Sequence, residues 1–183
     1  MLTAMFLIVL GTLCRLAPHP PNAVAIGALA LYAGARLPKA WAFLVPMVAM
    51  AASDVWIDWG SNQPVFTLSR LTIYATFAAM VAAGRLLKST TSPMPRMGMA
   101  LAASTVFFLT TNFAVWASPQ VASPGHPTFP ATFDGLMQCY VSALPFFGNS
   151  VMADLIGTAV LFSLDGLAFR LLPRRKPAAL AFE

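Results

Sequence analysis

The sequence predicts an all-α membrane protein, folded as a six-transmembrane-helix bundle. Of its 183 residues, 58% are hydrophobic and only 9% are charged, and the mean hydropathy is +0.74. A chain with so few charges cannot cover itself with a solvated polar surface, so lipid must be its main solvent. A membrane helix needs about 20 residues, which leaves room for roughly six crossings in a single transmembrane domain over 1–183.

Apolar runs, separated by Pro, Gly and charged clusters, place these helices at about 1–15, 22–36, 39–53, 66–87, 97–117 and 148–172. The first three runs are shorter than a full span, which favours tilted crossings or helices whose ends are shielded by protein. The opening run lacks a basic flank and an A-x-A cleavage site, so it is interpreted as a retained first helix and not as a signal peptide.

The connections between the helices differ in length and composition. The PHPPN segment after the first helix cannot be helical, because Pro18, Pro20 and Pro21 lack amide donors and have a fixed φ. A long outer loop is predicted over 118–147, and its proline-rich first half is typical of a lid or a binding loop. Its last part, GLMQCYVSALPFF at 135–147, is too short and too polar to cross a bilayer. It is interpreted as an interfacial helix or as a loop folded over the helix ends.

The basic residues are distributed unevenly over this topology. Only Arg15 and Arg70 lie near the outer face. If both termini are cytoplasmic, nine of the eleven Lys and Arg residues fall on the inner side: Arg36, Lys39, Arg85, Lys88, Arg96, Arg170, Arg174, Arg175 and Lys176. This positive-inside bias predicts a multi-pass protein with both termini in the cytoplasm. Because the helix ends account for the net charge of +5, no nucleic-acid partner is expected.

Polar and aromatic groups gather on the outer side instead. Such groups, converging from three outer loops and the outer helix ends, suit a pocket that is open to the outside of the cell. The tryptophans would stack on a ligand or shield it, and the charged and amide side chains would orient it. The candidate ligand-binding residues are His19, Asn22, Asp54, Trp56, Asp58, Trp59, Arg70, Asn112, Trp116, Tyr140, Asn149 and Asp154.

The same residues have structural interpretations. The stretch SDVWIDWG, with two carboxylates beside two tryptophans, fits a site wall, but it also fits a solvated loop with an interfacial aromatic belt. Asp154 lies inside the last predicted helix, where an unpaired carboxylate is costly. Arg70 is the expected counter-ion of Asp154 or of Asp54. Such a pair is either a ligand contact or a buried structural ion pair.

Histidine, cysteine and motif content give weaker signals. His19, in a rigid PHPP turn, is either a ligand contact or a loop histidine without a partner, and His126 is a weaker candidate. Cys139 is either a soft metal ligand or a small hydrophobe, and a single disulfide with Cys14 stays open. No H-E-x-x-H, G-x-S-x-G, phosphate-binding glycine loop or Cys/His cluster is present, so neither an enzyme nor a metal site is predicted.

Four segments carry a family resemblance: RLAPHPPNAVAIGALALYAGA, LVPMVAMAASDVWI, TNFAVWAS and YVSALPFFGNSVMADLIGTAVLF. In this order they resemble an uncharacterised family of small bacterial inner-membrane proteins over most of the chain. That family is distantly similar to the substrate-binding S components of energy-coupling-factor (ECF) transporters. The resemblance implies a six-helix protein of the bacterial inner membrane that binds vitamins or metal ions from the outer side, with the loops after helices one, three and five. It also implies uptake with an ATP-driven module made by other chains.

The small-residue helix departs from the S-component pattern. S components present an Ala-x-x-x-Ala seam to their transmembrane partner from the first helix, whereas here the second predicted helix is rich in small residues. Ala23 and Gly27, then Ala30 and Gly34, are four apart. This spacing lets two helices approach closely in lipid, and it suits either an internal seam or a docking face for a partner protein.

The function expected from the sequence is capture and uptake of a small, vitamin-like solute from the outer face. The expected partners are the lipid bilayer, the ligand and an ATP-driven module or other membrane subunits. Cobalamin is one candidate ligand, with His19, His126 or Cys139 reaching the cobalt, although none matches a family ligand position. The alternative is a non-transporting accessory subunit of a larger membrane complex. An intramembrane enzyme that depends on His19 or Asp154 is a third interpretation.

Overall fold

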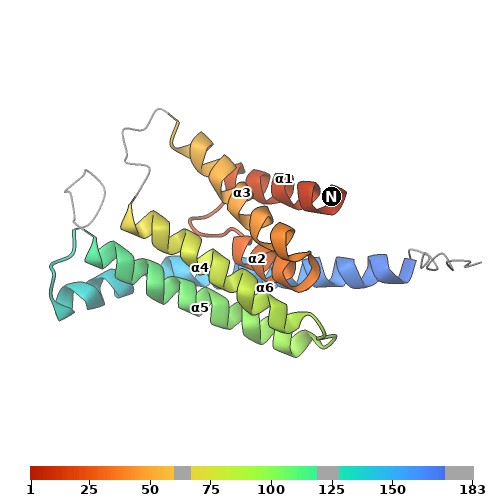
Figure 1. Cartoon of the computed structure of the whole chain (residues 1–183). Coiled ribbons are helices and arrows are strands. Elements are labelled where there is room, and N and C mark those ends of the chain that lie inside the picture. The colour runs from red at the N-terminus through yellow and green to blue at the C-terminus, as the bar shows by residue number, and fades with distance from the viewer. Residues whose placement is uncertain (60–66, 119–127, 172–183) are drawn as a thin grey trace, which may run out of the picture.

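The structure, a computed structural model of the chain, is a bundle of helices (Figure 1). It describes residues 1–59, 67–118 and 128–171. Within these residues, all regular structure is helical: α1 Leu2–Leu16, α2 Ile26–Arg36, α3 Lys39–Ile57, α4 Leu68–Gly84, the 3₁₀ turn η1 Arg85–Leu87, α5 Pro93–Ala117 and α6 Phe133–Leu171. The all-α fold predicted from composition is confirmed for the described residues.

Four of these helices are long and apolar enough to cross a membrane. They are α3, α4 together with η1, α5, and α6 as far as Ala168. By their length and composition, these helices indicate a membrane protein. α1 is a shorter apolar helix of 15 residues. α2 has only 11 residues, so at about 1.5 Å per residue it covers about half of the hydrocarbon thickness. Six full crossings are therefore not confirmed.

α2 lies at the centre of the bundle. Every residue from Ile26 to Ala35 is buried, and the helix packs against α3, α4 and α6. A half-length helix can lie at membrane depth because neighbouring helices, and not lipid, surround its ends. The small-residue seam predicted for this helix is therefore internal, and α2 is not a docking face for a partner.

Two glycines set the separation between α2 and α4. A Cβ on Gly34 would collide with the backbone carbonyl of Val81, and a Cβ on Gly84 would collide with that of Leu31. Backbone atoms of packed helices cannot move aside as the end of a flexible side chain can. The close approach of these helices therefore depends on glycine at both positions.

α6 is one continuous helix of 39 residues. The second half of the outer loop predicted over 118–147 differs in the structure, because α6 begins at Phe133 and runs through Pro145 into the predicted last span. Residues 135–147 are therefore helical and not a folded-back loop, and residues 119–127 of the predicted loop lie outside the described residues. An internal proline removes one helical hydrogen bond, but membrane helices tolerate this when neighbouring groups compensate. At about 1.5 Å per residue α6 is about 58 Å long, nearly twice a hydrocarbon core of about 30 Å.

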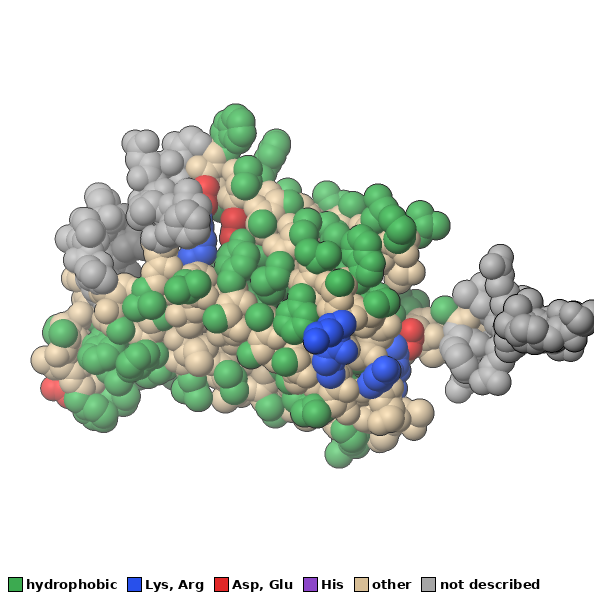
Figure 2. Space-filling view, in the orientation of Figure 1, with side chains coloured by type: hydrophobic (Ala, Val, Ile, Leu, Met, Phe, Trp, Pro, Cys, Tyr) green, Lys and Arg blue, Asp and Glu red, His purple; other side chains and the backbone are tan. Residues whose placement is uncertain are grey.

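The two ends of the bundle differ in charge. The C-termini of α2 and α4 meet the N-termini of α3 and α5 at one end, which we call the basic end because it carries Arg36, Lys39, Arg85, Lys88 and Arg96. Figure 2 shows basic side chains gathered there. The N-terminus of the chain and the last described turn of α6 also lie at this end (Figure 1). The predicted inner residues Arg174, Arg175 and Lys176 lie outside the described residues.

α6 also holds the C-terminal end of α2. Arg36 Nε lies 2.7 Å from Asp165 Oδ2, and the Tyr32 hydroxyl donates a hydrogen bond of 3.2 Å to Asp165 Oδ1. The ring of Phe162, also on α6, packs edge-on against Tyr32, with 5.3 Å between the ring centroids. The central helix is thus attached to α6 at the basic end by charge, hydrogen bonding and aromatic packing together.

Candidate functional site

A cavity of about 330 Å³ lies at the end of the bundle opposite the basic end, which we call the cavity end. Its walls come from α1 to α6 and from the loop between α1 and α2. Figure 2 shows acidic and basic side chains together between α3 and α4 at this end. The polar part of the lining consists of Arg15, His19, Asn22, Asp54, Asp58, Arg70, Ser150 and Asp154.

The rest of the lining is apolar. Its largest members are side chains of α3, α4 and α5: Met50, Ile73, Phe77, Met80 and Phe107. A cavity of this size with an apolar wall and a few convergent polar groups is typical of a site for a small organic ligand.

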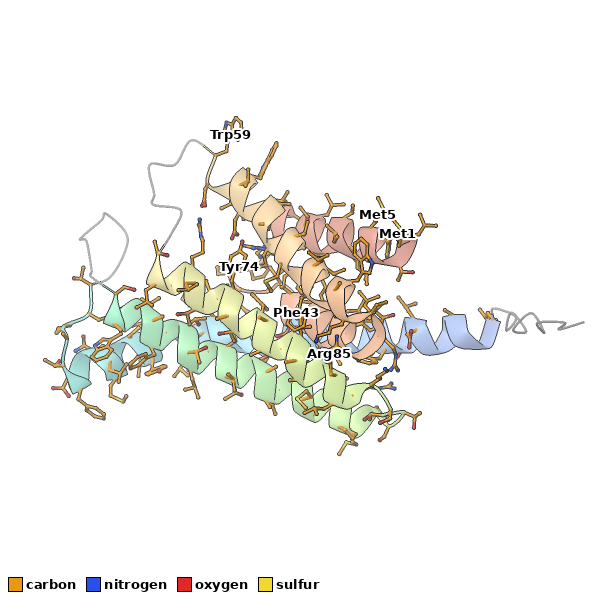
Figure 3. All side chains as sticks on the ribbon, in the orientation of Figure 1. Met1, Met5, Phe43, Trp59, Tyr74 and Arg85 are labelled. Carbon is orange, nitrogen blue, oxygen red and sulfur yellow. The ribbon has the colours of Figure 1, made fainter. Side chains whose placement is uncertain are left out.

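The first ion pair of the cavity links α1 to α3. Arg15 Nη2 lies 2.7 Å from Asp54 Oδ1, and the two side chains are 18% and 14% exposed. Tyr74 on α4 donates a hydrogen bond of 2.8 Å from its hydroxyl to Asp54 Oδ2, and Figure 3 shows this tyrosine between α4 and α3. Asp54 therefore joins three helices, and both of its oxygens have partners.

The second ion pair links α4 to the end of α3. Arg70 Nη2 lies 2.6 Å from Asp58 Oδ2, and these side chains are more exposed, at 27% and 26%. The prediction that Arg70 would pair with Asp154 or Asp54 is therefore wrong. Asp54 already has Arg15 as its charged partner, and Asp58, at the C-cap of α3, is the carboxylate that Arg70 reaches.

The helical repeat separates the carboxylates of SDVWIDWG from its tryptophans. Because α3 continues to Ile57, Asp54 and Asp58 are one turn apart and share the face that lines the cavity. Trp56, two residues from each, lies on the opposite face and is 71% exposed. Trp59 is 82% exposed and points away from the bundle (Figure 3). The carboxylates thus form a wall of the cavity, while the tryptophans face outward, as in an interfacial aromatic belt.

Asp154 occupies the inner wall of the cavity and is only 5% exposed. Its Oδ1 accepts a hydrogen bond of 2.9 Å from the backbone N–H of Ala28, and its Oδ2 accepts one of 2.8 Å from the Ser104 hydroxyl. Ala28 is in the first turn of α2, whose N-cap residue, Ala25, has no side-chain capping bond. Asp154 therefore caps α2 from another helix and places its negative charge at the positive end of the helix dipole.

The loop between α1 and α2 closes one side of the cavity. Asn149 Nδ2 on α6 donates a hydrogen bond of 2.9 Å to the carbonyl of Pro21, and the Ser150 hydroxyl donates one of 3.2 Å to the carbonyl of Asn22. Asn22 has a φ of 61°, a left-handed conformation that asparagine adopts more readily than most residues. Asn149 thus does not line the cavity itself, but it holds in place the loop that closes one side of it.

His19 lies in the same loop, at the rim of the cavity. Its Nδ1 is 2.8 Å from the carbonyl oxygen of Pro20, and its Nε2 is 3.2 Å from that of Arg15. The main chain therefore holds the ring in place, although the residue is exposed. His126, the other histidine considered from the sequence, lies outside the described residues.

The remaining predicted residues lie away from the cavity. Trp116 Nε1 donates to the carbonyl of Pro130 at 2.9 Å, and the Tyr140 hydroxyl donates to the carbonyl of Leu109 at 2.8 Å. Asn112 Nδ2 donates to a main-chain carbonyl within its own helix at 2.7 Å. The hydrogen bonds of Trp116 and Tyr140 connect α5 to the segment before α6 and to α6, whereas that of Asn112 stays within α5. In the structure these residues, together with Trp56 and Trp59, do not line the cavity.

Sequence reasoning missed Arg15 and the apolar wall. Arg15 was one of only two basic residues predicted near the outer face, and such an arginine within a membrane helix needs a carboxylate partner. That signal would have identified it as a candidate. The apolar residues, such as Phe77 and Phe107, have the same spacing as any core-facing residues, so nothing in the sequence marks them as lining a cavity.

The two ion pairs are expected to differ in strength. A double-mutant cycle with Arg15→Gln and Asp54→Asn should give a coupling free energy of about 2 kcal/mol, because this pair is the less exposed and Tyr74 orients the carboxylate. The cycle with Arg70→Gln and Asp58→Asn should give less than about 1 kcal/mol, as more exposed pairs do. Reversible unfolding in mixed detergent micelles measures both. Equal coupling in the two cycles would contradict the predicted order.

The family of the chain follows from comparison with known proteins. A family model described as a family of unknown function (DUF6580) matches residues 1–179. The chain belongs to the DUF6580 family. No curated protein matches it significantly, and neither does any solved structure.

In this DUF6580 protein, the described residues contain no cluster of three or more His, Cys, Asp or Glu side chains able to hold a metal ion. Cys14 is exposed and Cys139 is buried, and both are free thiols. The Cys139 thiol lies 3.5 Å from the carbonyl oxygen of Asn112, between α5 and α6. The disulfide left open by the sequence is therefore not formed, and Cys139 packs as a small buried side chain.

Proposed function

We propose that this DUF6580 protein binds a small organic solute in the cavity and acts as the capture subunit for its uptake. The observation that carries the proposal is the combined lining. Two ion pairs, Arg15–Asp54 and Arg70–Asp58, face an apolar wall inside a helical membrane protein. Such a lining can orient a polar group of a ligand while an apolar part is withdrawn from water.

The proposal includes an S-component-like role in the bacterial inner membrane. The cavity would open to the outer side, and the basic end would face the cytoplasm, in accordance with the positive-inside rule. Both the arrangement of the basic residues and the position of the N-terminus at the basic end support this orientation. Uptake would then need an ATP-driven module made by other chains.

The ligand of this proposal is a vitamin-like organic molecule, and the protein binds it without chemical change. Cobalamin is not favoured. Cys139 is buried between α5 and α6 and does not line the cavity, and His19, although at the cavity rim, has both ring nitrogens near main-chain carbonyl oxygens. The enzyme alternative depended on His19 or Asp154, and Asp154 has both carboxylate oxygens occupied by Ala28 and Ser104. Its arrangement therefore suits helix capping better than proton transfer.

The accessory-subunit alternative is also less favoured. It depended on a small-residue helix that would pack against another subunit, and that helix, α2, is buried within the bundle. The small residues hold this chain together, and a partner would have to bind elsewhere.

A cavity-filling variant tests the proposal. Ile73 lines the cavity, so Ile73→Trp should displace a bound solute without changing any charged group. Ile156 is 57% exposed on α6, and Ile156→Trp is the matched control. We expect the wild type and Ile156→Trp to co-purify with the same small molecule, detected by native mass spectrometry after gentle extraction, and Ile73→Trp to retain at least about ten-fold less, a free-energy difference of about 1.4 kcal/mol.

Two results would contradict this proposal. One is a wild-type protein that carries only bulk phospholipid and detergent. The other is equal retention of the small molecule by Ile73→Trp and Ile156→Trp, which would place its binding site outside the cavity. Thermal unfolding of both variants shows whether the tryptophan has instead disrupted the fold.

A further inference from the structure

A second hollow adjoins the cavity between α3 and α4. It has a volume of about 820 Å³, and its walls are mostly apolar, with Ala51 and Val55 on α3 and Leu68 and Leu71 on α4. Leu71 is 68% exposed and Val55 is 65% exposed, so the hollow is a groove that opens sideways. Figure 1 shows α3 and α4 diverging toward this end of the bundle.

The groove and the cavity share three charged residues. Asp54, Asp58 and Arg70 line both hollows. The two spaces therefore meet at the ion pairs, and the boundary between them is made of charged side chains. From this geometry we infer that the ligand is an amphiphile, with its polar head group in the cavity and its hydrocarbon chain in the groove between α3 and α4. This inference rests on the proposed function and narrows its class of ligand.

The shared boundary favours one molecule that occupies both spaces. A hydrocarbon chain alone in the groove would end against carboxylates and guanidinium groups, which lose hydration without gaining a hydrogen bond. A compact polar solute alone in the cavity would leave the apolar groove to unrelated lipid. An amphiphile places polar atoms at the ion pairs and CH₂ groups along Val55, Leu68 and Leu71.

The groove cannot select the ligand by hydrophobicity. Lipid tails are as apolar as leucine, so a chain gains little when it moves from the bilayer to an apolar groove. Selection must come from the head group, at the ion pairs. At these pairs each aspartate has an arginine, since Arg15 pairs with Asp54 and Arg70 pairs with Asp58. The third carboxylate of the cavity, Asp154, is held on the inner wall by Ala28 and Ser104 and does not line the groove. A head group without net charge leaves both ion pairs intact, so the ligand is a zwitterionic or polyhydroxylated amphiphile.

The position of the groove gives such a ligand a route from the bilayer. Ala51 and Val55 belong to the span Lys39–Ile57, and Leu68 and Leu71 belong to the span Leu68–Leu87. All four residues lie near the cavity end of these spans, and the ends of a membrane span lie near the level where head groups and acyl chains meet. An amphiphile can therefore enter sideways, with its head group already at the level of Asp58 and Arg70.

Photocrosslinking in native membranes tests this assignment. The photoreactive amino acid p-benzoylphenylalanine replaces Leu71 in the groove or, as the control, Phe113, which is 50% exposed on α5 and is absent from both linings. The two sites lie at similar depth, because Ser69 and Thr76 of α4 contact Ser118 and Thr110 of α5. The full-length protein is irradiated in membranes, and the adduct masses are read by mass spectrometry.

We expect the Leu71 site to give one dominant adduct whose head group carries no net charge and which is enriched at least about five-fold over the Phe113 site. Asp58→Asn, added to the protein that carries the photoreactive residue at position 71, should abolish the enrichment, because it removes the carboxylate charge that pairs with Arg70. Three results would overturn the inference. The first is labelling of the same mixture of membrane phospholipids at both sites, and the second is the absence of any lipid adduct at Leu71. The third is an enrichment at Leu71 that Asp58→Asn leaves unchanged.

The outcome also separates this inference from the proposed function. If Ile73→Trp abolishes binding of a water-soluble molecule while Leu71 labels only bulk phospholipid, solute capture stands and the amphiphile assignment falls. If neither hollow retains a selected molecule, the proposed function itself fails.

Discussion

Gly34→Ala and Gly84→Ala are each expected to destabilise the protein by about 3 kcal/mol, at the upper end of the cost of overpacking a core. In both variants the new methyl group points at a backbone carbonyl of the facing helix, that of Val81 or of Leu31. The helices can accommodate it only by moving apart. Since α2 touches most other helices of the bundle, this movement disturbs the packing on its other sides as well.

Glycines that face open space provide the control. Nothing lies within 4 Å of a Cβ added at Gly98 or Gly166, so alanine there should leave stability unchanged or raise it by up to about 1 kcal/mol through higher helix propensity. Unfolding curves in mixed detergent micelles measure all four variants. If Gly34→Ala and Gly98→Ala unfold at the same detergent ratio, α2 and α4 are not in the close contact described above.

Asp154→Leu is expected to cost about 3 kcal/mol, whereas Asp154→Asn should cost about 1 kcal/mol. Leucine leaves the Ala28 N–H and the Ser104 hydroxyl without their acceptor in a buried place, at about 1–3 kcal/mol for each unsatisfied group, and it removes the cap of α2. Asparagine retains an acceptor oxygen for Ala28, and its NH₂ group can donate to the Ser104 hydroxyl oxygen where the carboxylate accepted from it, so the main loss is the charge at the helix N-terminus.

The same unfolding assay gives the order of these variants. Asp134 is exposed in the first turn of α6, and Asp134→Leu should change stability by no more than about 0.5 kcal/mol. Hydrogen exchange at the start of α2 offers a local readout, because amides that have lost their cap open more readily. Protection of the Ala28 amide that is unchanged in Asp154→Leu would show that another group caps α2.

The sequence predicted the helical architecture well because its signal is repeated along the whole chain. The proline-rich turn between α1 and α2, and the polar or charged breaks near 37 and 90, all separate helices in the structure. Helix length was harder to predict. α2 looked like a short span because its residues are as apolar as a lipid-facing helix, yet what surrounds it is protein. Composition alone does not distinguish burial in protein from burial in lipid.

The segment before Pro145 caused the largest difference in the fold. Taken alone, residues 135–147 are too short and too polar to cross a bilayer, so they were assigned to the outer loop. Pro145 also cannot donate a helical hydrogen bond. In a membrane bundle the missing hydrogen bond is tolerated. The long apolar stretches on both sides of Pro145 then form one helix, because leaving backbone groups unpaired in lipid would cost more than the proline does.

The site was predicted in part, and helical periodicity explains which part. Asp54 and Asp58 reach the cavity because residues four apart share a helix face, while Trp56 falls on the opposite face. If the third predicted helix had been continued past residue 53, the same rule would have placed the two carboxylates on one face and Trp56 on the other before the structure was known. The partner of each carboxylate could not be predicted, because the choice between Arg15 and Arg70 depends on how α1 and α4 are placed around α3.

The two attachments of α2 to α6 have a mechanical consequence. Asp154 and Asp165 are eleven residues apart, three turns of one uninterrupted helix, and they hold opposite ends of α2. Sliding α6 along its axis relative to α2 would strain both attachments at once, so we expect the two helices to move together. A displacement of α6 near Ser150 is therefore expected to move α2 as well, and with it Arg36 at the basic end.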